Sequence, residues 1–301
     1  MFTMSKDKRP TVWWAEDGQR LGTFVGHQGS VYMCDVTDDS KILITASGDS
    51  SVRLWNVEDG TERFKFEFSE PCRAVSFSTG EQLAVCSSDA FMGSAPSLHI
   101  LKIAEDPRDQ TMAPLKTMMM DDKGRITRAF FTPLNDQIIS SHEDGTLKRW
   151  DTETGKLLQT AELHEKIIND VKFSEDKTHF VTASTDQKCH LVDTTTFEIL
   201  RTYKPERPCN TAAISPLFDH IAIGGGQDAS AVTTTAGAAG KFEACFFHKL
   251  YAEEFGRVRG HFGPLNALAF APDGRGFITG GEDGYVRLHH FSSDYLNTKF
   301  Y

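Results

Sequence analysis

The chain has 301 residues, of which 39% are hydrophobic and 25% are charged. This composition is typical of a soluble globular protein with a large buried core, and it excludes a disordered chain or a coiled coil. Its 42 acidic residues outnumber its 32 basic residues, for a net charge of −10. We therefore expect no direct nucleic-acid interface and no binding to an anionic membrane surface.

The cysteines and the first residues indicate a cytoplasmic protein. Six cysteines are scattered along the chain without a CxxC pair, which fits thiols in a reducing compartment better than disulfides or a zinc site. The opening MFTMSKDKRP has no apolar core, and no run of about 18 apolar residues occurs. We expect neither secretion nor a membrane span.

A repeat of roughly 42 residues organises the chain. In five copies an aspartate precedes a bulky or ring-bearing position by six residues, and aligning strand ends extends the series to seven positions: Trp13, Trp55, Leu101, Trp150, Val192, Phe247 and His289. Repeats of this length with four short strands are typical of WD-propeller blades. The sequence predicts an all-β fold, a seven-bladed WD-repeat β-propeller whose first blade is incomplete at the N-terminus.

The predicted blades form a single WD-repeat domain over residues 1–301. In the second blade, strands a to d are expected at 30–36, 41–47, 51–56 and 61–67, and the apolar run ILIT in strand b indicates burial on both faces. The predicted blade boundaries are 1–24, 25–68, 69–119, 120–160, 161–204, 205–258 and 259–301.

The two ends depart from this repeat. Trp13 leaves only residues 1–5 for strand b of the first blade and nothing for its strand a. We expect either that the chain is truncated or that this blade has three strands. The tail, residues 295–301, alternates in polarity and is predicted to pair at the outer edge of the last blade. Otherwise that edge would be open to pairing with another chain.

A histidine before the second blade points to a structural hydrogen-bond network. The d–a and b–c connections of an antiparallel meander lie at the same end of the sheet, so His27 can reach Asp49. We predict a structural tetrad of His27, Ser47, Asp49 and Trp55, with Thr45 as the alternative hydroxyl. A Ser–His–Asp set also suggests a catalytic triad, but its recurrence in several blades favours scaffolding.

Two other blades keep the histidine and the aspartate without the tryptophan: His164 with Asp186, and His261 with Asp283. We expect these blades to depend more on packing.

Two insertions interrupt the period between strands b and c. SDAFMGSAP occupies 88–96 in the third blade, and QDASAVTTTAGAAG occupies 227–240 in the sixth. Long loops on a rigid scaffold are common sites of partner contact, and a tolerated insertion is the alternative for each.

Motifs of enzyme chemistry are absent from the sequence. No GxxxxGK[ST], HExxH or GxSxG pattern occurs, and Gly224–Gly226 precede no helical pattern, so these glycines are expected to permit a tight bend. We expect no catalytic, cofactor-binding or metal-binding residues, and no enzymatic activity.

The last third of the chain carries more specific signals. The stretches GGGQDASAVTTT, GKFEACFFH, EEFGRVRGHFGPLN and GGEDGYVRLHHF lie within 206–291. With FTMSKD, GQRLGTFVGH and TASGDSSVRLWN upstream, they closely resemble the family of subunit i of eukaryotic translation initiation factor 3. The resemblance covers nearly the whole chain and is weakest around residues 88–125.

This resemblance implies a non-enzymatic scaffold subunit of the initiation factor, which reaches the 40S ribosomal subunit through the complex. The implied partners are subunit b, whose helical segment docks around blades 5 and 6, and subunit g. Candidate docking residues are Asp193, Tyr203, Glu206, Arg207 and Phe218, with core packing as the alternative for Tyr203 and Phe218. The alternative function is a WD-repeat signalling adaptor associated with receptor kinases. A propeller enzyme or RNA reader is a third class.

Overall fold

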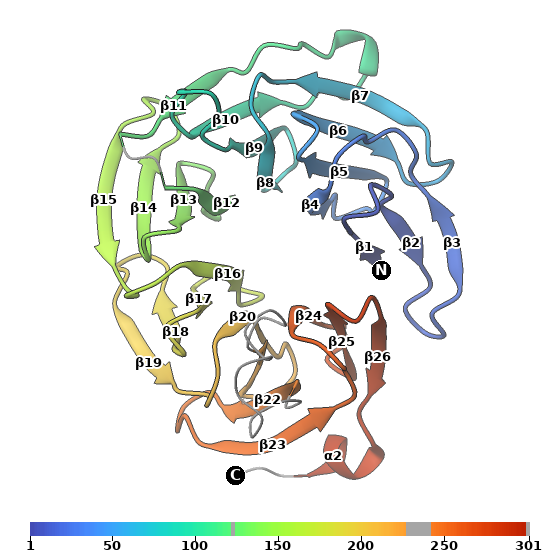
Figure 1. The fold of residues 1–301 in the computed structure, drawn as a ribbon, viewed down its shortest axis with the longest axis vertical. Helices are drawn as coiled ribbons and strands as arrows, with labels where there is room; N and C mark the ends of the chain where they lie inside the picture. Colours follow the sequence, from blue (N-terminus) through green and yellow to red (C-terminus); the bar gives the residue numbers. More distant parts are fainter. Residues whose placement is uncertain (122–123, 227–241, 299–301) are drawn as a thin grey trace. The chain divides into compact units, whose positions relative to one another are not determined.

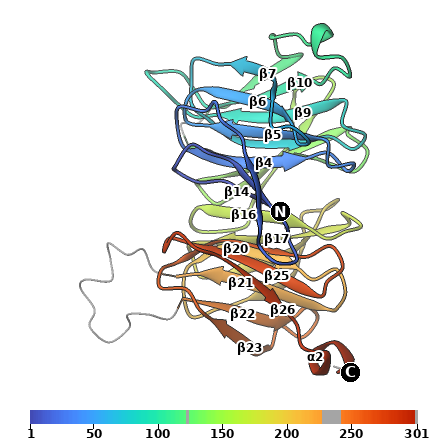
Figure 2. The same ribbon diagram turned by 90° about the vertical axis from the view of Figure 1, so that its right-hand side faces the viewer.

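The computed structural model describes residues 1–121, 124–226 and 242–298 (Figures 1 and 2). The chain divides into two compact units, Met1–Glu162 and Leu163–Tyr301. The predicted insertion at 227–240 lies outside the described residues. Among the described residues, no helix has the length and the apolar character that a membrane span requires.

The first unit contains four antiparallel sheets in chain order. Each is a meander in which sequence neighbours pair (Figure 1). Their strands are β1 (Phe2–Thr3), β2 (Thr11–Trp13) and β3 (Arg20–Thr23); β4 (Val31–Val36), β5 (Ile42–Ser47), β6 (Ser51–Asn56) and β7 (Glu62–Glu67); β8 (Cys72–Phe77), β9 (Leu83–Ser88), β10 (Ser97–Lys102) and β11 (Lys116–Met119); β12 (Ile126–Phe131), β13 (Gln137–His142), β14 (Thr146–Asp151) and β15 (Leu157–Glu162). A short 3-10 helix, η1 (Pro107–Asp109), precedes β11.

The second unit contains three sheets of the same kind and a short helix. They comprise β16 (Ile168–Phe173), β17 (His179–Ser184), β18 (Cys189–Asp193) and β19 (Ile199–Tyr203); β20 (Cys209–Ile214), β21 (His220–Gly225), β22 (Glu243–His248) and β23 (Glu254–Arg259); β24 (Leu265–Phe270), β25 (Gly276–Gly281) and β26 (Val286–His290), followed by α2 (Ser293–Asn297). In the described residues the chain is thus all-β with seven blades, and the predicted fold class is confirmed. The first and last sheets have three described strands each.

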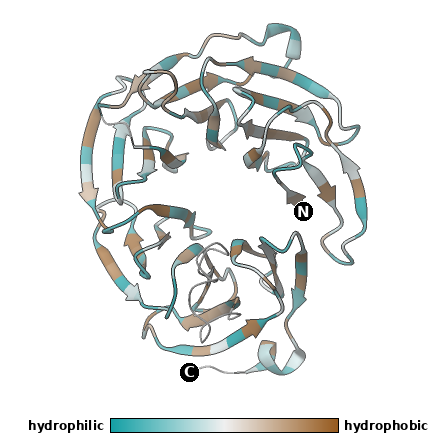
Figure 3. Ribbon diagram, viewed as in Figure 1, coloured by the Kyte–Doolittle hydropathy of each residue, from teal (hydrophilic) through white to brown (hydrophobic). Residues whose placement is uncertain are grey.

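Burial follows the blade pattern. Leu43–Ser47 on β5 are all buried, as expected for a strand covered on both faces. The outer strand β7 alternates between polar and apolar residues (Figure 3) and places Phe66 in a cluster with Val75 and Leu101 of the next sheet. Each sheet therefore buries its apolar residues against a sequence neighbour, because one sheet cannot cover both faces of its own strand b.

The predicted strand in the tail is wrong for the part of it that is described. Ser293–Asn297 form α2, with Ser292 as N-cap accepting a hydrogen bond from the Tyr295 backbone NH at 3.3 Å. Tyr295 stacks on Phe291 with ring centroids 4.2 Å apart. The cap and this stacking turn the chain into a helix where polarity alone suggested a strand.

Candidate functional site

In the second blade, one threonine joins the histidine to the tryptophan. His27 Nε2 lies 2.7 Å from Thr45 Oγ1, and Trp55 Nε1 donates to the same hydroxyl at 2.9 Å. Ser47, the residue predicted for this place, instead accepts a hydrogen bond from the Asp49 backbone NH at 3.2 Å. The register explains the correction: Thr45 pairs with Arg53 and Ser47 with Ser51, so Ser47 is farther along the sheet from Trp55.

Asp49, the acid of this network, has several hydrogen-bond partners. Asp49 lies 2.9 Å from His27 Nδ1 and accepts from Ser51 Oγ at 2.6 Å and from the Gln28 backbone NH at 2.8 Å. Burial raises the pKa of Asp49, but these hydrogen bonds outweigh it and hold that pKa well below its usual range. His27 is 4% exposed, so a substrate has little access to it. The arrangement suits a structural role within the blade.

The last blade has its own four-member network, and the sequence had indicated its histidine and aspartate, His261 and Asp283, but not its threonine. His261 lies 3.0 Å from Asp283 and 2.8 Å from Thr279 Oγ1, and His289 Nε2 lies 3.1 Å from the same hydroxyl. His289 thus takes the place of Trp55. An imidazole thus replaces the indole as the hydrogen-bonding ring of this blade.

The fourth and fifth blades vary the network. In the fifth, His164 contacts Asp186 at 2.9 Å and Thr182 at 2.8 Å, and it stacks on His190 with centroids 4.3 Å apart. In the fourth, Trp150 donates to Ser140 Oγ at 2.9 Å, and the histidine comes from strand β13 itself: His142 Nε2 lies 2.8 Å from that hydroxyl.

The five predicted docking residues do not gather in one place. Tyr203 is fully buried, donates its hydroxyl hydrogen to the Lys249 carbonyl at 2.6 Å and packs against Phe247. Tyr203 is a core residue and is not part of a docking surface. Phe218 packs against His220 and Tyr295, each with centroids 5.5 Å away, in the a–b turn of its blade.

Asp193 also lies away from the remaining two. It ends β18 and caps the c–d turn, where its Oδ1 accepts from the backbone NH groups of Thr195 and Thr196 at 2.9 and 2.8 Å. The a–b and c–d turns lie at one end of a meander and the d–a loops at the other. Only Glu206 and Arg207, in the loop between β19 and β20, remain together.

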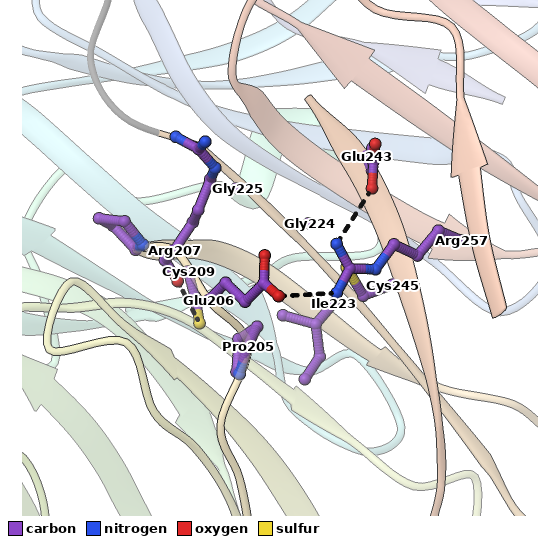
Figure 4. Close-up of a pocket in the computed structure, with 11 residues that line it drawn as sticks. Pro205, Glu206, Arg207, Cys209, Ile223, Gly224, Gly225, Glu243, Cys245 and Arg257 are labelled. Atoms are coloured by element: carbon purple, nitrogen blue, oxygen red, sulfur yellow. Dashed lines mark hydrogen bonds and ion pairs between the residues drawn. The ribbon is translucent and has the colours of Figure 1, made fainter. Parts of the chain in front are cut away.

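Glu206 and Arg207 line a small pocket at the d–a end of the sixth blade (Figure 4). Its volume of about 30 Å³ admits a water molecule or the tip of a side chain rather than a metabolite. The other lining residues come from the loop itself and from β20 to β23: Pro205, Pro208, Cys209, Ile223, Gly224, Gly225, Glu243, Cys245 and Arg257.

Arg257 is the charged centre of this pocket, and the sequence did not single it out. It pairs with Glu243 at 3.4 Å and with Glu206 at 3.5 Å (Figure 4). It also pairs with Glu254 on its own strand. The hydrogen bonds that Arg257 donates to the Glu254 carboxylate outweigh the effect of burial and, with the contribution of Glu206, raise the pKa of Arg257. Glu243 is buried, whereas the Glu206 side chain is 64% exposed. The pocket therefore offers solvent an acidic group that a fixed cation holds in place.

The glycine run at the end of β21 lets the pocket loop approach closely. A Cβ on Gly225 would lie 2.1 Å from the Pro208 carbonyl oxygen. The Gly226 backbone NH donates to that same oxygen at 3.1 Å, and Gly226 has a φ of +147°. The predicted bend is thus a close contact between β21 and the loop that only glycine allows.

Three asparagines continue from this loop in a hydrogen-bonded row. Asn169, Asn210 and Asn266 each occupy a β-bulge at the start of strand a in blades 5, 6 and 7. Asn169 Nδ2 donates to the Cys209 carbonyl at 2.8 Å, Asn210 Nδ2 to Asn266 Oδ1 at 2.8 Å, and Asn266 Nδ2 to Glu282 at 3.2 Å. The sequence held a signal, since asparagine recurs at the second position of these strands.

Comparison with known proteins gives a consistent result over the full length. The family model described as EIF3I matches residues 1–301. A protein from Nematostella vectensis named eukaryotic translation initiation factor 3 subunit I is 43% identical over 300 residues, covering 100% of this chain and 92% of the relative. Relatives of the same name from Drosophila willistoni and Xenopus tropicalis are 44% and 41% identical, again over 100% of this chain and over 94% and 92% of theirs.

Proposed function

This chain belongs to the eukaryotic translation initiation factor 3 subunit I family, and from that membership we propose that it is a non-enzymatic scaffold of the complex. The coarser role, a subunit of a translation initiation factor, follows from the family itself. In the proposal, the chain works in the cytoplasm and reaches the 40S ribosomal subunit through its sister subunits.

The proposed docking site for the helical segment of subunit b, with subunit g alongside, is the pocket at the d–a end of the sixth blade. The observation that supports it most directly is Glu206, exposed to solvent and held 3.5 Å from Arg257. A fixed acidic group beside the apolar faces of Pro205 and Pro208 suits a helix that brings a basic side chain and an apolar one.

Charge reversal at Glu206 tests this site. Calorimetric titration of the full chain with the helical segment of subunit b should show binding that Glu206→Lys weakens about tenfold, or ~1.4 kcal/mol. Glu253→Lys is the matched control, because Glu253 is exposed in the c–d turn of the same blade. Equal losses in both variants, or no binding by the unmodified chain, would contradict the proposed site.

The signalling-adaptor alternative predicts a different distribution in cells. As an initiation-factor scaffold, the chain should sediment with 40S particles in a cell extract, and Glu206→Lys should reduce that fraction. An adaptor would instead remain with receptor kinases, whichever residue stands at position 206.

A further inference from the structure

The third blade carries a long loop between its strands b and c. Residues 89–96 join β9 to β10, whereas the corresponding loops of the second and fourth blades span only 48–50 and 143–145. The b–c and d–a connections of a meander lie at the same end of the sheet, so the extra residues lie at the d–a end of the blade. The proposed function gives this loop no role.

Hydrogen bonds fix both ends of the loop. The Asp89 backbone NH donates to the Pro71 carbonyl at 2.8 Å. The Asp89 carboxylate accepts from Arg73 Nε at 3.1 Å and from Arg73 Nη2 at 2.6 Å. At the other end Pro96 is buried, and its carbonyl accepts from the Met120 backbone NH at 2.9 Å. The loop is therefore held to the blade on both sides of its tip.

The tip is a tight turn over residues 91–94. The Phe91 carbonyl accepts from the Ser94 backbone NH at 2.9 Å and from the Ser94 hydroxyl at 2.7 Å. Met92 and Gly93 have φ angles of +47° and +98°, and a type I′ turn requires positive φ at both central positions. Methionine is uncommon in this region, and such a conformation persists only where the surrounding structure imposes it.

This ordered tip presents apolar side chains to solvent. Phe91 is 44% exposed and Met92 is 93% exposed. Aromatic residues and methionine are enriched in protein interfaces, and a preorganised loop loses less conformational entropy on binding. Because a tight turn is convex, its apolar side chains fit a pocket on a folded protein.

The charges beside the turn favour a protein over other partners. Asp89 pairs with Arg73, and Glu143 pairs with Arg125, at side-chain exposures of 39% and 45% for the second pair. Electrostatic interactions link the two pairs, since Arg125 interacts with Asp89 and Glu143 with Arg73. These four residues carry no net charge, so they offer no attraction to RNA or to anionic lipid. They suit a pocket whose rim carries charges of both signs.

We propose that the 91–94 turn docks into an apolar pocket on a folded sister subunit of the initiation factor. Phe91 and Met92 enter the pocket, and the pair of Arg125 and Glu143 contacts its rim. The inference rests on the proposed function, in which the chain is a scaffold of this factor. The turn shares no residue with the pocket around Glu206, so it is a separate contact.

The probe is the initiation-factor complex purified from cells depleted of this chain. Surface plasmon resonance with the immobilised full chain should show binding that the double change Phe91→Ser and Met92→Ser weakens about tenfold or more. Leu134→Ser is the matched control, because Leu134 is 84% exposed in the a–b turn of the fourth blade. This control should change the affinity by less than about twofold.

A glycine substitution tests the shape of the turn. Gly93→Val keeps both apolar side chains but disfavours the φ of +98°, so it should weaken binding about threefold or more. If that variant fails to fold, hydrogen exchange of the unmodified chain decides: the complex should protect backbone amides of 90–95. Equal losses with Leu134→Ser, full binding by a folded Gly93→Val, or no protection of 90–95 would overturn this inference alone. No binding by the unmodified chain would overturn the proposed function with it.

Discussion

At the scale of single residues, three of the hydrogen-bond networks share the same sequence spacing of histidine, threonine and aspartate. His27, His164 and His261 each contact a threonine 18 residues later and an aspartate 22 residues later. The aspartate spacing was evident in the sequence. The choice between Thr45 and Ser47 was not, because both lie on the same face of a strand and only the register across to Trp55 separates them.

Removal of the shared hydroxyl should be costly. Thr45→Val keeps the shape of the side chain but takes away the partner of both His27 Nε2 and Trp55 Nε1. The free energy of unfolding, measured by urea titration, should fall by about 2–3 kcal/mol, because two buried polar groups lose a partner. Ser47→Ala is the control and should cost under about 1 kcal/mol. A larger loss in the control would restore Ser47 to the tetrad.

At the scale of elements, turn chemistry and the apolar runs of strand b predicted the order and type of the strands. They could not predict α2: five residues are too few to show a helical period, and its stability rests on the Ser292 cap and on contacts with distant rings. The β-bulges were also missed, since one extra residue in a strand leaves its composition unchanged. These bulges position Asn169, Asn210 and Asn266 for the hydrogen-bonded row.

This row should act as a unit. Asn210→Ala breaks the link to Asn266 and should lower the free energy of unfolding by about 1 kcal/mol. Adding Asn266→Ala should cost less than its separate effect, because Asn266 then has no link to Asn210 left to lose. Thermal unfolding of the two single variants and the double variant measures this. Strictly additive losses would show that the asparagines stabilise their blades independently.

At the scale of the whole chain, the sequence predicted seven repeats of one blade, five of them from the aspartate spacing and two from the alignment of strand ends, and each repeat buries its faces against a neighbour. The division into two compact units was not evident, since the period continues across the boundary at Glu162. Of the charged residues that line the pocket, Glu206 and Arg207 were named from the sequence as docking candidates. Glu243 on β22 and Arg257 on β23 were not, because they lie three and four strands farther along the chain.

Buried histidines in both units should make stability depend on pH. Burial lowers the pKa of His99, His190 and His220 to about 4. Between about pH 6.5 and pH 4 the unfolded chain therefore binds more protons than the folded chain, and stability falls as the pH falls through this range. The melting temperature should drop from pH 7 to pH 5, and His220→Gln should reduce that slope. His290→Gln, at an exposed site, is the control. An unchanged slope in His220→Gln would contradict this account of His220.

The contact between Tyr295 and His220 has a consequence for the end of the chain. The phenol oxygen lies 2.6 Å from His220 Nδ1, and its ring covers Phe218. A nonsense codon or a carboxypeptidase that removed everything from Tyr295 onward would remove these contacts from His220 and Phe218 of the sixth blade. The blade would then present an uncovered phenylalanine to chaperones and proteases, although no residue of its own sequence had changed.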